Sequence, residues 1–142
     1  MKLGFTGTQN GMTPMQVLKI AQFIAHNVID ETHSGDCWGA DSEFLELINL
    51  ANKNKNFRKI KTIGHIPTNN SKRAFRKYDE ERVPKPYLDR NKAIVDECDY
   101  LIAAPKESLM QLSSGTWSIV RQAKRVDRIG MIVYPDGRIE AL

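Results

Sequence analysis

The chain has 142 residues, 41% hydrophobic and 27% charged, which is typical of one globular domain, and no change in composition divides residues 1–142. It contains no apolar run of the roughly 18 residues that a membrane-spanning helix needs, and Met1 does not begin a charged-then-apolar leader, so we expect a cytoplasmic protein and no membrane contact. Cys37 and Cys98 lack the spacing of a CxxC pair or a zinc motif, so we expect reduced thiols, no metal and no cofactor.

The net charge of +4 is unevenly distributed. Residues 58–92 hold eleven lysines and arginines against four acids, which gives +7 there and −3 in the remainder of the chain. Such a block could face phosphates or polyanions, or it could be an ordinary solvated surface.

The first predicted unit is a strand, a loop and a helix. The strand Lys2–Thr6 leads into residues 7–11, which are rich in turn-forming residues. Thr13 and Pro14 are a good N-cap and first-turn residue for a helix. Apolar side chains then recur at helical spacing, at Val17, Ile20, Ala21, Ile24 and Val28.

A second such unit follows. Residues 31–34 form a weak strand that ends in the loop 35–41, and a helix is predicted after it from the spacing of Phe44, Leu45, Leu47, Ile48 and Ala51. The β-branched, alternating stretch 59–66 predicts a third strand that closes at Pro67.

Residues 68–86 lack a clean period, which predicts a long loop of the kind that often serves as a lid or binding loop. Arg73, Arg76 and Lys77, interleaved with Phe75 and Tyr78, are the candidate lid residues that would grip a phosphate.

The last part of the chain resumes the alternation of helices and strands. We predict helices over 87–97 and 115–126, strands over 99–104 and 128–134, and a short tail or edge strand over 138–142. Five strands alternating with helices indicate a Rossmann-like, doubly wound α/β fold with a mainly parallel sheet and helices on both faces. A ligand crevice is then expected at the carboxyl ends of the strands, where the strand order reverses.

The loops that follow the strands supply the candidate site. A helix N-terminus with small residues favours phosphate or carboxylate, because free N–H groups and the helix dipole point at the ligand. Arg90 offers a guanidinium fork for the same anion. The predicted ligand-binding residues are Gly7, Thr8, Gly35, Asp36, Arg90, Ser114, Gly115 and Thr116. If Arg90 faces the crevice, its removal should leave folding nearly unchanged.

Other side chains near the strand ends have two interpretations. His33 and His65 could touch the ligand or be hydrogen-bonded structural residues. Trp38 and Trp117 could stack on a base or belong to the core.

These motifs resemble the SLOG superfamily of Rossmann-like nucleotide-binding proteins, which includes the Lonely Guy phosphoribohydrolases and the Smf/DprA proteins. The matching features are Gly4–Thr8, the 35–41 loop, Arg90 nine residues before Asp99, the strand ending at Pro105, and Gly115-Thr116. In Lonely Guy enzymes the arginine is followed by a Pro-Gly-Gly-x-Gly-Thr-x-x-Glu motif whose backbone cradles phosphate and whose glutamate serves catalysis. Here an insert, 106–114, precedes Gly115, and Ile119 occupies the glutamate position.

The resemblance implies a single SLOG-like domain and a homo-oligomer. Because Ile119 can neither activate water nor stabilise an oxocarbenium ion, the first hypothesis is a sensor or sequestering protein. It would hold a nucleoside phosphate or an ADP-ribose-type molecule without turnover. The alternative is a phosphoribohydrolase or N-glycosyl transferase that uses Asp36 or Asp41 as its carboxylate. Single-stranded DNA binding through residues 72–77 ranks last, because the net charge is low for it.

Overall fold

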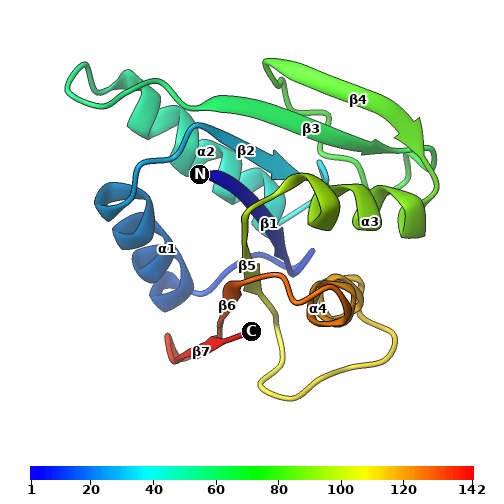
Figure 1. Ribbon diagram of the computed structural model, residues 1–142. Helices are drawn as coiled ribbons and strands as arrows, with labels where there is room; N and C mark the ends of the chain where they lie inside the picture. The colour runs from blue at the N-terminus through cyan, green and yellow to red at the C-terminus, as the bar shows by residue number, and fades with distance from the viewer.

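The computed structural model describes residues 1–142, which are organised around one seven-stranded sheet (Figure 1). The strands are β1 (Lys2–Gly7), β2 (Glu31–Ser34), β3 (Lys61–Pro67), β4 (Glu80–Lys85), β5 (Tyr100–Ala104), β6 (Gly130–Val133) and β7 (Ile139–Ala141). The helices are α1 (Pro14–His26), α2 (Ala40–Lys53), α3 (Tyr87–Glu97) and α4 (Gly115–Arg125). None of these helices has both the length and the hydropathy needed to cross a bilayer.

The sheet has the order β4-β3-β2-β1-β5-β6-β7, and every neighbouring pair is parallel except β6 and β7. From β1 the chain builds outward through β2, β3 and β4, and then returns to place β5 on the other side of β1. The strand order therefore reverses between β1 and β5, and the crevice of such a sheet lies at the carboxyl ends of these two strands.

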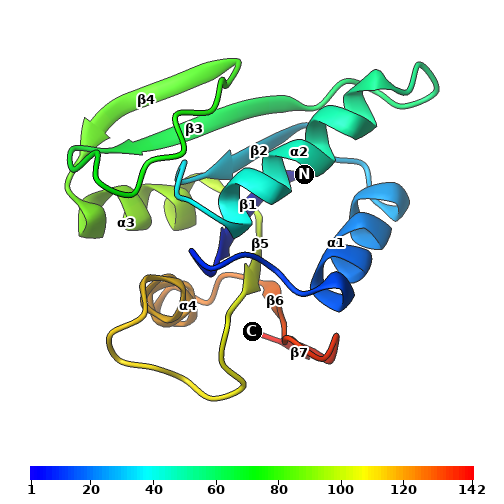
Figure 2. The ribbon, with the colours of Figure 1, turned by 180° about the vertical axis from the view of Figure 1, so that it is seen from behind.

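Helices cover both faces of the sheet: α1 and α2 one face, α3 and α4 the other (Figures 1 and 2). On the first face Phe5 and Phe44 stack with ring centroids 4.3 Å apart, inside a cluster that includes Ile20, Ile48 and Ile102. The second face is filled by two clusters, one with Ile94, Leu101 and Ile119 and one with Ala103, Trp117 and Ile132.

The start of α1 is fixed by a reciprocal cap that the sequence predicted in part. The Thr13 hydroxyl accepts the Gln16 N–H at 3.2 Å, and the Gln16 side chain accepts the Thr13 N–H at 2.9 Å. The Gln16 amide also donates to Pro105 O and Val133 O. Gln16 therefore ties α1 to the carboxyl ends of β5 and β6.

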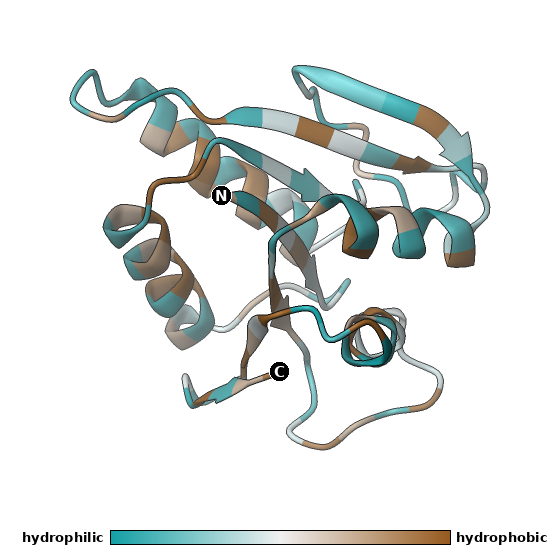
Figure 3. Cartoon of the chain, in the orientation of Figure 1, coloured by the Kyte–Doolittle hydropathy of each residue, from teal (hydrophilic) through white to brown (hydrophobic).

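The mainly parallel α/β sheet with helices on both faces is confirmed, but the predicted number of five strands was wrong, because there are seven. Part of the predicted loop 68–86 forms β4, an edge strand that pairs in parallel with β3. It was missed because Glu80–Lys85 is hydrophilic over most of its length (Figure 3) and contains Pro84. The tail 138–142 supplies β7, an antiparallel edge strand. Charge and proline are typical of edge strands, which have only one partner.

Candidate functional site

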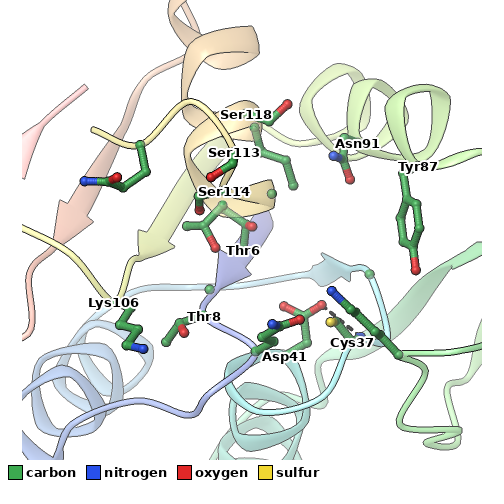
Figure 4. Close-up of a pocket in the computed structure, with 18 of the residues that line it drawn as sticks. Thr6, Thr8, Cys37, Asp41, Tyr87, Asn91, Lys106, Ser113, Ser114 and Ser118 are labelled. Atoms are coloured by element: carbon green, nitrogen blue, oxygen red, sulfur yellow. Dashed lines mark hydrogen bonds between the residues drawn. The ribbon is translucent and has the colours of Figure 1, made fainter. Parts of the chain in front are cut away.

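A cavity of about 800 Å³ opens at the carboxyl ends of β1 and β5 (Figure 4). The loop after β1, the loop after β2, the first turns of α3 and α4, and residues 106–107 after β5 contribute to its wall. Of the eight predicted ligand-binding residues, all but Asp36 line it. The strand-order argument therefore located the cavity correctly.

The first turn of α4 presents unpaired backbone donors to this cavity. The Ser114 hydroxyl caps the helix by accepting the Trp117 N–H at 3.3 Å, and Ser114 O accepts the Ser118 N–H at 3.0 Å. The N–H groups of Gly115 and Thr116 have no acceptor in the protein. A Cβ placed on Gly115 would meet no protein atom within 4 Å, and Gly115 and Thr116 both line the cavity, so this turn is open to a ligand. Such a helix start suits an anion.

Arg90 lies on the opposite wall and is only 8% exposed. Its Nε donates to Asn91 Oδ1 at 2.8 Å, and its Nη1 donates to Gly35 O at 2.5 Å and to His65 O at 3.4 Å. The guanidinium therefore faces the cavity while much of its donor capacity is used by the protein. Folding should depend on it, contrary to the expectation from the sequence.

Two of the predicted glycines have packing reasons for being glycine. A Cβ on Gly35 would overlap the Arg90 guanidinium, and a Cβ on Gly7 would overlap the Ala40 Cβ. Both residues line the cavity through their backbone, and both allow a neighbour that shapes it to approach closely. Thr8, by contrast, organises the loop: its hydroxyl accepts the Asn10 N–H at 3.1 Å, and its carbonyl accepts the Ala40 N–H at 2.9 Å.

Asp41 is the buried carboxylate of the cavity. Burial raises its pKa from the ordinary 3.8 to about 6, although Arg90 and the Cys37 N–H, which donates to Oδ2 at 3.1 Å, act in the opposite direction. Cys37 lies beside it on the wall. Burial, and after it the nearby Asp41, raise the pKa of the Cys37 thiol above its ordinary value. A carboxyl group that titrates near pH 6 could accept or give a proton, or hydrogen-bond a ligand hydroxyl.

Asp36, the other candidate carboxylate, does not line the cavity and is fully buried. Its Oδ2 accepts the Arg73 Nε at 2.9 Å, and its Oδ1 accepts the Arg76 N–H at 3.0 Å and the Tyr78 hydroxyl at 3.3 Å. Its backbone has φ 56°, an uncommon value outside glycine. Asp36 therefore anchors residues 73–78 to the loop after β2.

The three candidate lid residues also lie outside the cavity wall. Arg73 pairs with Asp36, and Arg76 pairs with Glu46 at 2.6 Å and reaches the Ser42 hydroxyl at 3.3 Å. Lys77, an exposed residue, has no ion-pair partner within 4 Å. The lysine of this basic segment that does line the cavity is Lys72.

Sequence reasoning missed one side of α3. Tyr87, Arg90, Asn91 and Ile94 are spaced one turn apart and all line the cavity. Figure 4 shows Tyr87 and Asn91 on this helix, across the site from Lys106. The signal was available, because positions three, four and seven residues apart share a helix face, and Arg90 had already been selected.

The tryptophans and histidines predicted near the strand ends do not line the cavity. Trp117 is 3% exposed and packs in the core beside Ile132, while Trp38 is half exposed and does not line the cavity. His33 and His65 are buried against each other, away from the cavity wall. Ile119, at the position of the Lonely Guy glutamate, does line the cavity and offers only an apolar side chain. Glu107, the second acid of the wall, accepts the Trp117 indole N–H at 3.2 Å.

Comparison with known proteins supports the fold. No protein-family model and no curated protein matches the chain. Among solved structures, the molybdenum cofactor binding protein from the phototrophic bacterium Rippkaea orientalis superposes with a TM-score of 0.64 and 21% identity, over 94% of this chain and 76% of that chain. The protein TM1055 superposes with a TM-score of 0.61 and 12% identity, over 89% of this chain and 70% of its own. At these identities the likeness concerns the Rossmann-like architecture, and it places this chain among mainly parallel α/β proteins of that kind.

Proposed function

We propose that the protein binds a nucleotide-derived small molecule in this cavity, with a phosphate group on the first turn of α4, and that it holds this molecule without chemical turnover. The single observation that carries the proposal is the pair of unpaired N–H groups at Gly115 and Thr116, which face open space at the strand-order reversal. The SLOG resemblance of the motifs agrees with this class of ligand.

The charges around the cavity favour an anion. Its wall includes Lys72, Arg90, Lys106 and Arg121 against only Asp41 and Glu107. Arg121 is occupied by Gln111 O and Leu112 O, and Arg90 by Gly35 O, so Lys72 and Lys106 are the cations without a protein partner. A phosphate on α4 would gain charge-assisted bonds from such side chains.

The opposite end suits the remainder of a nucleotide. Tyr87 presents an aromatic ring that packs 5.3 Å from Arg90 Cζ, and the Asn91 amide and the Asp41 carboxyl are nearby hydrogen-bonding groups. A sugar hydroxyl or a base edge can pair with such groups, and a base can lie against the ring. We therefore propose that the phosphate lies toward α4 and the heterocycle toward α3.

The absence of turnover is argued from the acids. N-glycosidic hydrolysis needs placed carboxylates, and the position of the Lonely Guy glutamate holds Ile119. Glu107 is engaged with Trp117, and Asp36 lies outside the cavity. This leaves Asp41 alone, so a phosphoribohydrolase or transferase is the second candidate, favoured by the pKa of Asp41 near 6.

A panel of ligands separates these candidates. Isothermal titration of adenosine monophosphate, ADP-ribose and inorganic phosphate measures binding, and chromatography of the same mixtures measures released base. The molybdenum cofactor is itself a phosphorylated heterocycle, and one structural neighbour is a molybdenum cofactor binding protein. Mass spectrometry of the molecules released from the denatured protein should therefore also search for phosphorylated pterins. Nucleotide binding without base release supports the proposal; base release lost in Asp41→Asn but retained in Asp36→Asn supports the enzyme.

Two further expectations remain part of the proposal. Homo-oligomerisation, implied by the SLOG resemblance, is measured by light scattering at several concentrations. Nucleic-acid binding stays last, because Arg73 and Arg76 of the basic segment are engaged by Asp36 and Glu46. A steep loss of single-stranded DNA affinity with salt would be its signature.

A further inference from the structure

A second polar cluster lies under α3, away from the cavity. His33 of β2 and His65 of β3 occupy neighbouring strands and are 0% and 1% exposed. His33 Nδ1 lies 2.8 Å from His65 Nε2, and Glu97 at the end of α3 places Oε2 3.6 Å from the same His65 nitrogen. Three potential ligand atoms thus lie within 4.8 Å of one another. None of the three residues lines the cavity.

Further carboxylate and guanidinium contacts orient these groups. Glu31 Oε1 lies 2.9 Å from His33 Nε2, so the proton of this ring sits on Nε2, and Nδ1 accepts the Nε2–H of His65. A bound ion would replace that proton, with His65 in its Nδ1–H tautomer. Arg82 binds only the Oε1 atom of Glu97, with its Nε at 3.0 Å and Nη2 at 2.8 Å, which leaves Oε2 directed at the histidines. A carboxylate behind a ligand histidine and a hydrogen bond behind a ligand carboxylate are the outer contacts that metal sites use.

Two of the three ligand-atom distances are close to those of a tetrahedral site, and the third, between His33 Nδ1 and Glu97 Oε2, is within 4.8 Å and would have to shorten. With metal–ligand bonds of about 2.0–2.1 Å, neighbouring ligand atoms lie about 3.3 Å apart. The nitrogens, now 2.8 Å apart, would separate slightly, and the nitrogen and oxygen, now 3.6 Å apart, would approach slightly. The side chain of Glu97 is 35% exposed, so the cluster is reachable from solvent.

We propose that His33 Nδ1, His65 Nε2 and Glu97 Oε2 form a site for one divalent transition-metal ion of the Zn²⁺ type, with water as the fourth ligand. Two imidazoles and one carboxylate suit such an ion better than Mg²⁺ or Ca²⁺, which prefer oxygen ligands. This replaces the expectation of no metal, which rested on the absence of CxxC and Cys/His spacing in the sequence.

The site would have a structural consequence. It joins the end of α3 to β2 and β3, while Arg90 lies in the first turns of the same helix. A bound ion should therefore stabilise the helix that forms one wall of the cavity, by mass action on the folded state. The site does not depend on the identity of the cavity ligand.

The test uses untagged protein stripped of metal and titrated with Zn²⁺ by calorimetry, and with Co²⁺ by visible absorption. We expect one ion per chain, a rise in Tm with Zn²⁺, and the intense bands of four-coordinate Co²⁺. His65→Gln should weaken Zn²⁺ binding by about 100-fold or more and Glu97→Gln by about tenfold or more, because each removes a ligand atom. Glu97→Gln changes a partly exposed side chain, so it should fold even if His65→Gln does not.

His26 is the matched control. It is the third histidine of the chain, exposed, and its Nδ1 lies 2.7 Å from Gln22 O. His26→Gln should bind Zn²⁺ like the parent protein. Failure to bind Zn²⁺, binding that survives Glu97→Gln and His65→Gln unchanged, or binding that is lost in His26→Gln would each overturn the proposal.

Discussion

The two helices that open onto the cavity contribute to it in opposite ways. The α3 wall is internally satisfied, since Arg90 donates to Asn91, Gly35 and His65, and its neighbour Asp41 is buried. The α4 wall is incomplete, since the N–H groups of Gly115 and Thr116 have no acceptor and the space before Gly115 is open. A change on α3 should therefore alter stability first, whereas a change on α4 should alter binding while the fold survives.

The largest expected effect is that of Arg90→Ala on stability. The change removes hydrogen bonds from a charged group to Gly35 O and Asn91 Oδ1, each of which contributes about 1.5–3 kcal/mol. It also leaves a buried carbonyl without its donor. We expect the free energy of unfolding, measured by urea titration, to fall by about 3 kcal/mol or more.

Lys92→Ala is the control on the same helix. Lys92 is exposed and pairs only with Asp96, so the loss should be below about 1 kcal/mol. If both variants were equally stable, the α3 wall would not be the structural one, and the contrast between the helices would fail.

Asp41→Asn should stabilise the ligand-free protein. The folded pKa of about 6 lies above the ordinary 3.8, so the folded state binds the proton more tightly than the unfolded state does. The bound proton therefore adds to the free energy of unfolding below about pH 4, and this stabilisation is lost as pH rises through 6. A shift of two units corresponds to at most about 3 kcal/mol, and we expect Asn to recover about 1–3 kcal/mol of it above pH 7.

The measurement is urea unfolding of both proteins from pH 4 to pH 8. The advantage of the variant should grow between pH 4 and 6 and then level off. A variant less stable than the parent at pH 8 would mean that the charged carboxylate is well solvated or compensated by Arg90. Asp36→Asn should behave differently and destabilise, because it weakens the pairing with Arg73.

Gly115→Val tests the α4 wall. A Cβ at position 115 would meet no protein atom within 4 Å, so Tm should stay near that of the parent, while the branched side chain adds bulk beside the free N–H groups. Losing two bonds to a phosphate, each worth about 1.5–3 kcal/mol, should weaken nucleotide binding by about 100-fold or more. The nucleotide affinity of Gly115→Ala should lie between that of the parent and that of Gly115→Val. Unchanged affinity for adenosine monophosphate in Gly115→Val would place the anion elsewhere.

The sequence predicted the helices α3 and α4 better than it predicted the strand β4. Periodicity located Tyr87–Glu97 as a helix, and small residues after a strand located the start of α4. The strand β4 was missed because its stability comes from pairing with β3 and from ion pairs such as Lys61–Glu80, and not from an apolar pattern.

The roles of the two aspartates could not be separated in the sequence, because both belong to the same loop. Asp36 is turned away from the cavity by Arg73 and Tyr78, which lie 37 and 42 residues further along the chain. Only the tertiary fold brings those partners together. Arg90 was likewise predicted at the site and lines the cavity, but the backbone acceptors that make it structural come from the loop after β2 and from β3.

The smallest expected effect is that of the Thr116 hydroxyl. Thr116 is 6% exposed and lines the cavity next to Gly115, and its hydroxyl has no protein partner. Thr116→Val keeps the volume and removes only the hydroxyl, so the fold should be unaffected. One neutral hydrogen bond contributes about 0.5–1.5 kcal/mol, which corresponds to a loss of affinity of at most about tenfold.

Calorimetric titration of the same nucleotide against Thr116→Val and Gly115→Val then orders the two contributions. If the backbone of the first turn holds the phosphate, the hydroxyl is an auxiliary contact, and the loss in Thr116→Val must be smaller than the loss in Gly115→Val. The reverse order would mean that the ligand is held by side chains, with the free N–H groups of α4 left to water. The α4 wall would then bind its ligand as the α3 wall does, through side chains, and the contrast between the two helices would fail.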